Sequence, residues 1–99
     1  MVEEFIQNFH QGDFRIIDLF RNGYCYYFAV ILKVRFQDGN IYYQPLNNHF
    51  IFGLNEKYYD VTGEIDVADT ETYLWSVYAE VDKSHTKRII RDCILKVAD

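Results

Sequence analysis

The sequence predicts an α+β fold, and three patterns along the chain support this. Apolar residues recur at helical spacing near both ends of the chain. Between them lie short stretches rich in Tyr and Phe, separated by residues typical of turns. Helices, then a small antiparallel sheet, then further helices are typical of α+β architecture. The 99 residues contain no linker and no internal repeat, so we expect a single domain spanning residues 1–99.

Two short helices are expected at the start of the chain. Residues 2–10 place apolar side chains at helical spacing, with two glutamates in the first turn. Gly12 interrupts this pattern, and Asp13 then has a side chain suited to cap a second helix. Asn22-Gly23 breaks the chain after that helix.

The stretch from Tyr24 to Gln37 suits either a strand or a helix. Its β-branched and aromatic residues favour a strand. Its length, with charged side chains only at Lys33 and Arg35, favours a mostly buried helix that ends near Asp38-Gly39. We predict a central helix packed on the sheet.

Three short extended stretches follow, at Asn40–Gln44, His49–Phe52 and Lys57–Thr62. Pro45 stops the first of them. Gly53-Leu54-Asn55-Glu56 has turn chemistry, so the second and third stretches are expected to form a hairpin.

The last third of the chain is expected to return to helix. Glu64–Val67 fits a short extended segment. Asp69 or Thr70 can cap a helix within residues 70–82, although a strand there is also compatible with the sequence. Ser84 can cap a final helix, whose apolar stripe consists of Ile89, Ile90, Cys93, Ile94 and Val97.

Charge and composition disfavour several classes of protein. The net charge of −5 disfavours direct nucleic-acid binding, which usually needs a basic excess. The longest apolar run, Tyr24–Leu32, is far below the roughly 18 residues that span a bilayer. The acidic start at Glu3-Glu4 and the presence of only two cysteines do not fit a secreted protein. We therefore expect a cytoplasmic protein without a membrane partner.

Cys25 is the first residue with candidate chemistry, since it falls at the start of the predicted central helix. Unpaired N–H groups and the helix dipole lower the pKa of a thiol in that position, which favours the nucleophilic thiolate. Gly23 nearby lets backbone and substrate approach closely. A free cysteine is more often a small buried apolar residue, and that alternative stays open.

His49 and Asp60 are expected to lie on the same face of the hairpin. If Leu54-Asn55 centres the turn, the two residues are directly opposite, with Cβ atoms about 5 Å apart. If Asn55-Glu56 centres it, they are diagonal neighbours at about 7 Å. In both cases the carboxylate can reach the imidazole and fix its tautomer.

This arrangement resembles the papain-like superfamily of cysteine hydrolases, in particular its transglutaminase-like and cell-wall-amidase branches. The resemblance rests on the order of Cys25 at a helix start, His49-Phe50 on one strand, and Tyr58-Tyr59-Asp60-Val61-Thr62-Gly63 on the next. It implies that Cys25 is the nucleophile, His49 the general base, and Asp60 the residue that orients the base. Unlike the papain-type motif, no Trp follows Cys25. Asn22, or a backbone N–H near Cys25, is the candidate oxyanion donor.

Other residue types suggest weaker sites. Cys25, His49, His85 and Cys93 lack the close spacing of zinc ligands, so we expect no metal, and the chemistry above needs no organic cofactor. The adjacent tyrosine pairs suggest either core and scattered surface residues or a Tyr-rich binding face. The candidate members of that face are Tyr26, Tyr43 and Tyr59.

Two functions follow from these observations. The first is a small cysteine hydrolase or acyl-transferase that acts on an amide or peptide-type bond. The second is a non-enzymatic acidic module that binds another protein, for example a phage or mobile-element inhibitor of a bacterial immune effector such as a CRISPR nuclease. In both cases the partner is a protein or peptide. The chain is expected to be a monomer or, through an exposed edge strand at Asn40–Gln44, a homodimer.

Overall fold

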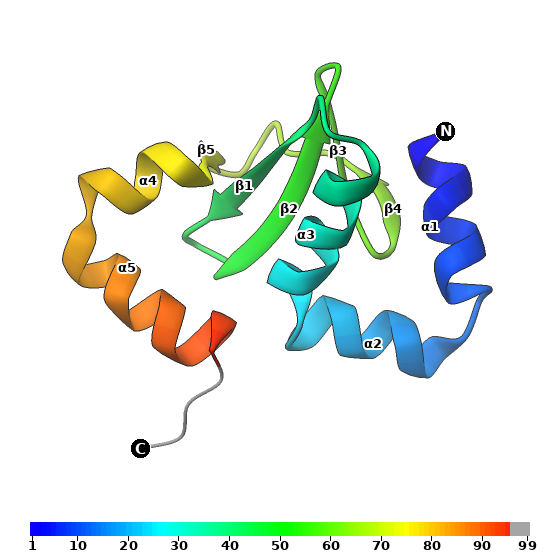
Figure 1. Ribbon diagram of the computed structural model, residues 1–99, viewed down its shortest axis with the longest axis horizontal. Helices are drawn as coiled ribbons and strands as arrows, with labels where there is room; N and C mark the ends of the chain where they lie inside the picture. Colours follow the sequence, from blue (N-terminus) through cyan, green and yellow to red (C-terminus); the bar gives the residue numbers. More distant parts are fainter. Residues whose placement is uncertain (96–99) are drawn as a thin grey trace.

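The fold is α+β, as predicted, with helices packed against a five-stranded antiparallel sheet. The computed structural model describes residues 1–95, except for the side chain of Cys93. In Figure 1 the sheet lies in the middle, with α1 and α2 on one side and α4 and α5 on the other. The sheet order is β4-β3-β2-β1-β5. The elements are α1 (Val2–His10), α2 (Phe14–Asn22), α3 (Cys25–Arg35), β1 (Asn40–Gln44), β2 (His49–Leu54), β3 (Lys57–Asp60), β4 (Gly63–Ile65), β5 (Tyr73–Leu74), α4 (Trp75–Val81), α5 (Lys83–Ile89) and a π-helical turn, η1 (Ile90–Ile94).

The first two helices begin and end as the sequence indicates. Helix α1 ends at His10, and the C-cap residue Gln11 has a φ of 49°, in the left-handed region. The Asp13 side chain caps α2 by accepting a hydrogen bond from the backbone N–H of Arg15. A short link at Gly23 and Tyr24 then leads directly into α3.

The ambiguous stretch after Tyr24 is the helix α3, which confirms that prediction. Phe28, Ala29 and Leu32 are its buried residues. Helix α3 packs against both β2 and α2 (Figure 1). Neighbours on more than one side explain why its apolar residues do not form a single stripe.

The hairpin of β2 and β3 adopts the second of the two predicted registers. Phe52 pairs with Tyr59 and Leu54 with Lys57, so the turn is centred on Asn55-Glu56. These two turn residues have φ of 53° and 64°, the positive values that a type I′ turn requires. The backbone twist of a type I′ turn matches the right-handed twist of the two strands, and this match favours the observed register.

Residues 70–82 contain both a strand and a helix. Tyr73 and Leu74 form the short strand β5, which pairs with Tyr43 and Tyr42 of β1, and α4 follows immediately. The expectation of an exposed edge strand at Asn40–Gln44 is therefore wrong, because β1 lies between β2 and β5.

The final helix begins earlier than expected. Asp82 caps α5 by accepting a hydrogen bond from the N–H of His85, so the assignment of Ser84 as the cap is wrong. Ile89 of the predicted apolar stripe is buried. The expectations for the Cys93 side chain and for Val97 lie outside the described residues.

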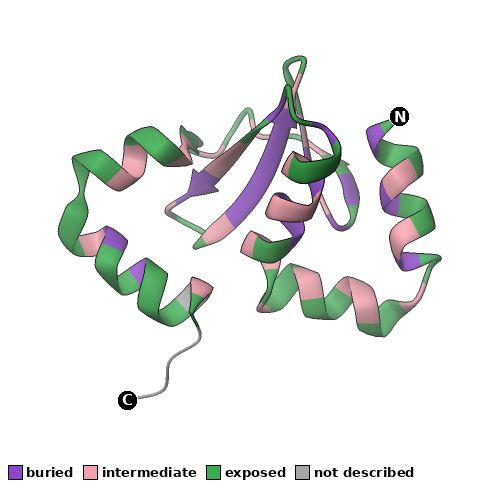
Figure 2. Ribbon diagram, in the orientation of Figure 1, coloured by how far each residue is buried: buried purple, intermediate pink, exposed green. Residues whose placement is uncertain are grey.

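The core lies between the helices and the sheet, and β2 is its most continuously buried strand (Figure 2). One cluster joins α1, α3 and β3, and a second joins α3, β1 and α5. Tyr43 is fully buried in the second cluster and Tyr59 is buried in the first. The prediction that Tyr43 and Tyr59 belong to a binding surface is therefore wrong. Their rings fill the core because adjacent strand residues alternate between the two faces of the sheet.

In the described part of the chain, no helix has both the length and the apolar character needed to cross a membrane.

Candidate active site

Cys25 is the first residue of α3, as the sequence predicts, and its thiol is half-buried. Tyr24 precedes it as the N-cap and contributes no side-chain cap to the helix. The first N–H groups of any helix have no acceptor within the helix, and Tyr24 supplies none from its side chain. Those of α3 therefore favour a negative charge nearby. In addition, the backbone N–H of Phe50 lies 3.5 Å from the Cys25 sulfur, within reach of a hydrogen bond to it.

His49 and Asp60 are in contact, although they are diagonal rather than opposite across β2 and β3. The His49 Nε2 lies 3.2 Å from the Asp60 Oδ2, and their side chains are only 16% and 11% exposed. This contact leaves Nδ1 as the imidazole nitrogen available to Cys25. The three residues named from the sequence thus come together at one end of the core.

Thr62 fixes the Asp60 carboxylate, a role that the sequence analysis missed. The Asp60 Oδ1 accepts the Thr62 backbone N–H at 2.8 Å and also the Thr62 hydroxyl. The spacing Asp-x-Thr, typical of an Asx-turn, is the signal that identifies this role from sequence. One carboxylate oxygen therefore bonds Thr62 and the other faces His49.

The three titratable groups shift one another's pKa values. Burial raises the pKa of the Cys25 thiol, but hydrogen bonds from His49 and from Phe50 N–H, with the charge of His49, hold it below its ordinary value. Burial lowers the pKa of His49, but its bonds to Asp60 and Cys25 raise that pKa to about 9. Burial raises the pKa of Asp60, but hydrogen bonds from His49 and Thr62 hold it below its usual range. All three shifts favour the charged forms of the groups, which are a thiolate, an imidazolium and a carboxylate.

An open cavity of about 390 Å³ gives access to this group. Its lining comes from the end of α2, the start of α3, the turn between β1 and β2, and η1. The lining residues are Arg21, Asn22, Gly23, Cys25, Asn47, Asn48, His49 and Asp92. A second cavity of about 320 Å³, lined in part by Arg21, Asn47, His49 and Asp60, adjoins the histidine.

Comparison with protein families gives a match over most of the chain. Residues 2–92 match the model of the family described as Phage YunG-like protein. The chain belongs to this family. No curated protein and no solved structure gives a significant match. The matched range contains α1 to α5 and all three residues of the Cys25–His49–Asp60 group.

In this family member, Asn22 and Gly23, the predicted support residues, both line the cavity beside Cys25. The side-chain amide of Asn22, however, donates a hydrogen bond of 2.7 Å to the Asp18 carboxylate. The Asn22 amide is thus already engaged with Asp18.

Arg21, Asn47 and Asn48 line the cavity but were not identified from the sequence. Asn48 adopts φ of 49°, and its side-chain oxygen accepts a 2.5 Å hydrogen bond from the buried Tyr43 hydroxyl. The Tyr43 hydroxyl therefore anchors the residue that precedes His49. No sequence motif identifies such contacts, because they depend on the packing of the turn.

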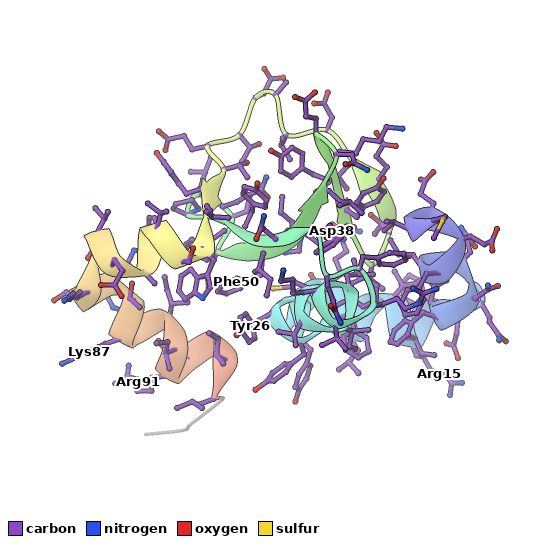
Figure 3. All side chains as sticks on the ribbon, turned by 45° about the horizontal axis from the view of Figure 1, so that its top comes forward. Arg15, Tyr26, Asp38, Phe50, Lys87 and Arg91 are labelled. Carbon is purple, nitrogen blue, oxygen red and sulfur yellow. The ribbon has the colours of Figure 1, made fainter. Side chains whose placement is uncertain are left out.

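The remaining candidates make other contacts. The His85 Nδ1 is 2.6 Å from the Tyr78 hydroxyl, within α4 and α5. Among the described residues, no three His, Cys, Asp or Glu side chains are grouped so as to hold a metal ion. Tyr26 is half-buried, and its ring packs edge-on against Phe50, with centroids 4.9 Å apart (Figure 3).

Proposed function

We propose that this phage-family protein is a small cysteine hydrolase or acyl-transferase that acts on an amide or peptide-type bond. The observation that carries the proposal is the contact of His49 with both Asp60 and Cys25 at the N-terminus of α3. Each of the three residues has a pKa shifted towards the charged state that nucleophilic catalysis needs.

In the acylation step, the Cys25 thiolate attacks the substrate carbonyl carbon and forms a carbon–sulfur bond. The carbonyl oxygen becomes an oxyanion beside the N–H of Cys25. Collapse of this intermediate breaks the bond to the leaving group, which takes the proton from His49 Nδ1. The product is a thioester on Cys25 and a neutral His49.

In the second step, neutral His49 takes a proton from water, or from an acceptor amine, as that nucleophile attacks the thioester. The Cys25 thiolate then leaves and the His49 proton restores the starting ion pair. Asp60 holds Nε2 throughout, so Nδ1 stays directed to the thiol side. Water gives hydrolysis and an amine gives acyl transfer.

The relation to the papain-like superfamily is part of this proposal. It is supported by the order of cysteine on a helix start, histidine on a strand and aspartate on the next strand. The packing of that helix against an antiparallel sheet is also consistent with it.

The test is the alkylation rate of Cys25 by iodoacetamide against pH, followed by peptide mass spectrometry that separates Cys25 from Cys93. We expect rapid reaction below the ordinary thiol pKa of about 8.5 and a slower reaction in His49→Ala. His85→Ala, away from the site, is the matched control. In parallel, p-nitrophenyl acetate should acetylate Cys25 in the wild type. A Cys25 that reacts no faster than in His49→Ala overturns the proposal.

A second candidate is a non-enzymatic inhibitor of a bacterial immune effector, which membership of a phage family favours. The exposed apolar residues Tyr73, Val77 and Val81 give such an inhibitor a contact surface. In this case Cys25→Ala retains the protection of phage, whereas Val77→Asp loses it. A cysteine hydrolase instead loses its reaction with p-nitrophenyl acetate in Cys25→Ala and keeps it in Val77→Asp.

A further inference from the structure

Arg21 is the one arginine or lysine among the described residues that line the cavity at Cys25. Arg21 lies in the last turn of α2 and lines both the cavity at Cys25 and the one beside His49 and Asp60. Among residues 1–95 it has no ion pair or hydrogen bond through its side chain. Its guanidinium is therefore available to a bound molecule.

The acidic groups nearby all have other partners. Asp60 is paired with His49, and Asp92 lies 2.8 Å from the Arg91 side chain. The Asp66 carboxylate accepts the N–H of Ala68, and Asp18 accepts the amide of Asn22. Although the whole chain has a net charge of −5, the Arg21 guanidinium at the entrance to the nucleophile forms no ion pair within residues 1–95.

The rest of the lining suits a polar substrate. Apart from Gly23 and Cys25, every residue that lines the cavity at Cys25 is polar or charged. A guanidinium presents paired N–H donors that match a carboxylate, and this pairing is stronger than a neutral hydrogen bond. None of the described lining residues has a large apolar side chain that could select an apolar acyl group.

We infer that Arg21 binds a carboxylate of the substrate, so that the enzyme acts on acyl compounds with an acidic group close to the scissile bond. This inference rests on the proposed function, because it assumes that Cys25 is the nucleophile. Arg21 then fixes the substrate so that its carbonyl carbon faces the thiolate, and the salt bridge raises the effective concentration of the reacting atoms. Substrates with a carboxamide in place of the carboxylate react more slowly.

The test uses two alkylating reagents of similar size, iodoacetate and iodoacetamide, which differ in charge. The imidazolium of His49 attracts iodoacetate in every variant. The measured quantity is therefore the ratio of the iodoacetate rate to the iodoacetamide rate at Cys25, and how this ratio changes when Arg21 is replaced. We expect Arg21→Gln to lower the iodoacetate-to-iodoacetamide ratio at Cys25 by about two- to five-fold at low salt. Arg21→Lys keeps the charge and most of the ratio.

Arg15→Gln is the matched control, since Arg15 is on the same helix but 91% exposed and paired with Asp13. It lies at the outer edge of the molecule (Figure 3). Its ratio should equal that of the wild type. A second measurement separates binding of a carboxylate from non-specific electrostatic attraction of anions. Succinate should protect Cys25 from iodoacetamide in the wild type, with a protection that saturates as its concentration rises, and should not protect it in Arg21→Gln. Chloride at the same ionic strength is the control for salt.

The outcomes distinguish the two proposals. If Cys25 reacts rapidly with iodoacetamide but Arg21→Gln leaves the ratio unchanged, or succinate gives no protection, the inference about Arg21 is wrong and the proposed function stands. If Cys25 is inert to both reagents in the wild type, the proposed function fails and the inference fails with it.

Discussion

The imidazole of His49 reaches the carboxylate of Asp60, with Nε2 and Oδ2 3.2 Å apart, across a diagonal of the β2–β3 hairpin. Continuing the observed register places Asp60 opposite Ile51, not opposite His49. The contact depends on the direction of both side chains at the ends of their strands. Thr62 fixes one of these directions by holding the other oxygen of the carboxylate.

Asp60→Asn should lower the pKa of His49, because it removes the negative charge that stabilises the imidazolium. Since the wild-type pKa is raised to about 9, we expect a fall of about one unit or more towards 6.5. An NMR titration of the His49 ring measures this shift. Asp66→Asn, an acid that also lines a cavity at His49, is the control and should have a smaller effect. An equal pKa in Asp60→Asn and the wild type would contradict the ion pair.

The same pair predicts how stability depends on pH. A histidine whose pKa is raised by folding stabilises the fold fully below its unfolded value of 6.5, and this contribution is lost as pH rises through the folded value. The Cys25 thiol has the opposite shift, so its contribution is present at high pH and is lost as pH falls through its folded value.

Cys25→Ser removes the opposing contribution and exposes that of His49. The free energy of unfolding should then decrease as pH rises above 6.5, by at most about 3 kcal/mol in total, the equivalent of the wild-type pKa shift. Urea unfolding at a series of pH values measures the decrease. In Cys25→Ser/His49→Gln the decrease should be absent, and its persistence would assign it to another group.

Sequence alone predicts the composition of the site better than its geometry. The two possible hairpin registers differ by two residues, so both leave His49 and Asp60 on the same face, which explains why the pair could be named. Choosing between the registers requires the backbone angles of Asn55 and Glu56. The role proposed for Arg21 also required the structure, since it depends on the lack of a side-chain partner within residues 1–95.

The boundaries of the fold show the same limitation. Composition leaves Tyr24–Gln37 between helix and strand, and only packing against both β2 and α2 favours the helix. Strand β5 is two residues long and exists only because β1 offers a free edge there, so no local pattern predicts it. The burial of Tyr43 and Tyr59 likewise follows from which face of each strand meets the helices.

Glu56→Gly should stabilise the protein. Glu56 has φ of 64°, a conformation that costs a residue with a side chain more than it costs glycine, and Asn-Gly is the preferred pair for a type I′ turn. We expect a gain of about 0.5–1 kcal/mol in the free energy of unfolding. Glu56→Ala removes the same charge without relieving the backbone and serves as the control. A loss of stability in Glu56→Gly would argue against the observed register.

Gly53→Ala should destabilise the hairpin on the face opposite α3. A Cβ at this position would lie 2.6 Å from the Tyr42 ring and 2.9 Å from the Tyr58 ring, which pack edge-on over the glycine. Thermal unfolding should show a loss of about 1–3 kcal/mol. In Gly53→Ala/Tyr42→Ala the clash is relieved, so the double variant should lose less than the sum of the two single changes.

Thr62→Val tests whether Thr62 acts on Cys25 through Asp60 and His49. Valine keeps the shape and the backbone N–H bond to Asp60 but removes the hydroxyl bond, which helps to hold the pKa of Asp60 below its usual range. The carboxylate should then hold His49 less firmly. We expect the alkylation of Cys25 below pH 8 to slow by about two- to five-fold, which is less than in Asp60→Asn.

Thr62→Ser restores the hydroxyl and should restore the rate. If serine and valine slow the reaction equally, Thr62 contributes only packing. If neither slows it, the backbone N–H alone is sufficient to position Asp60.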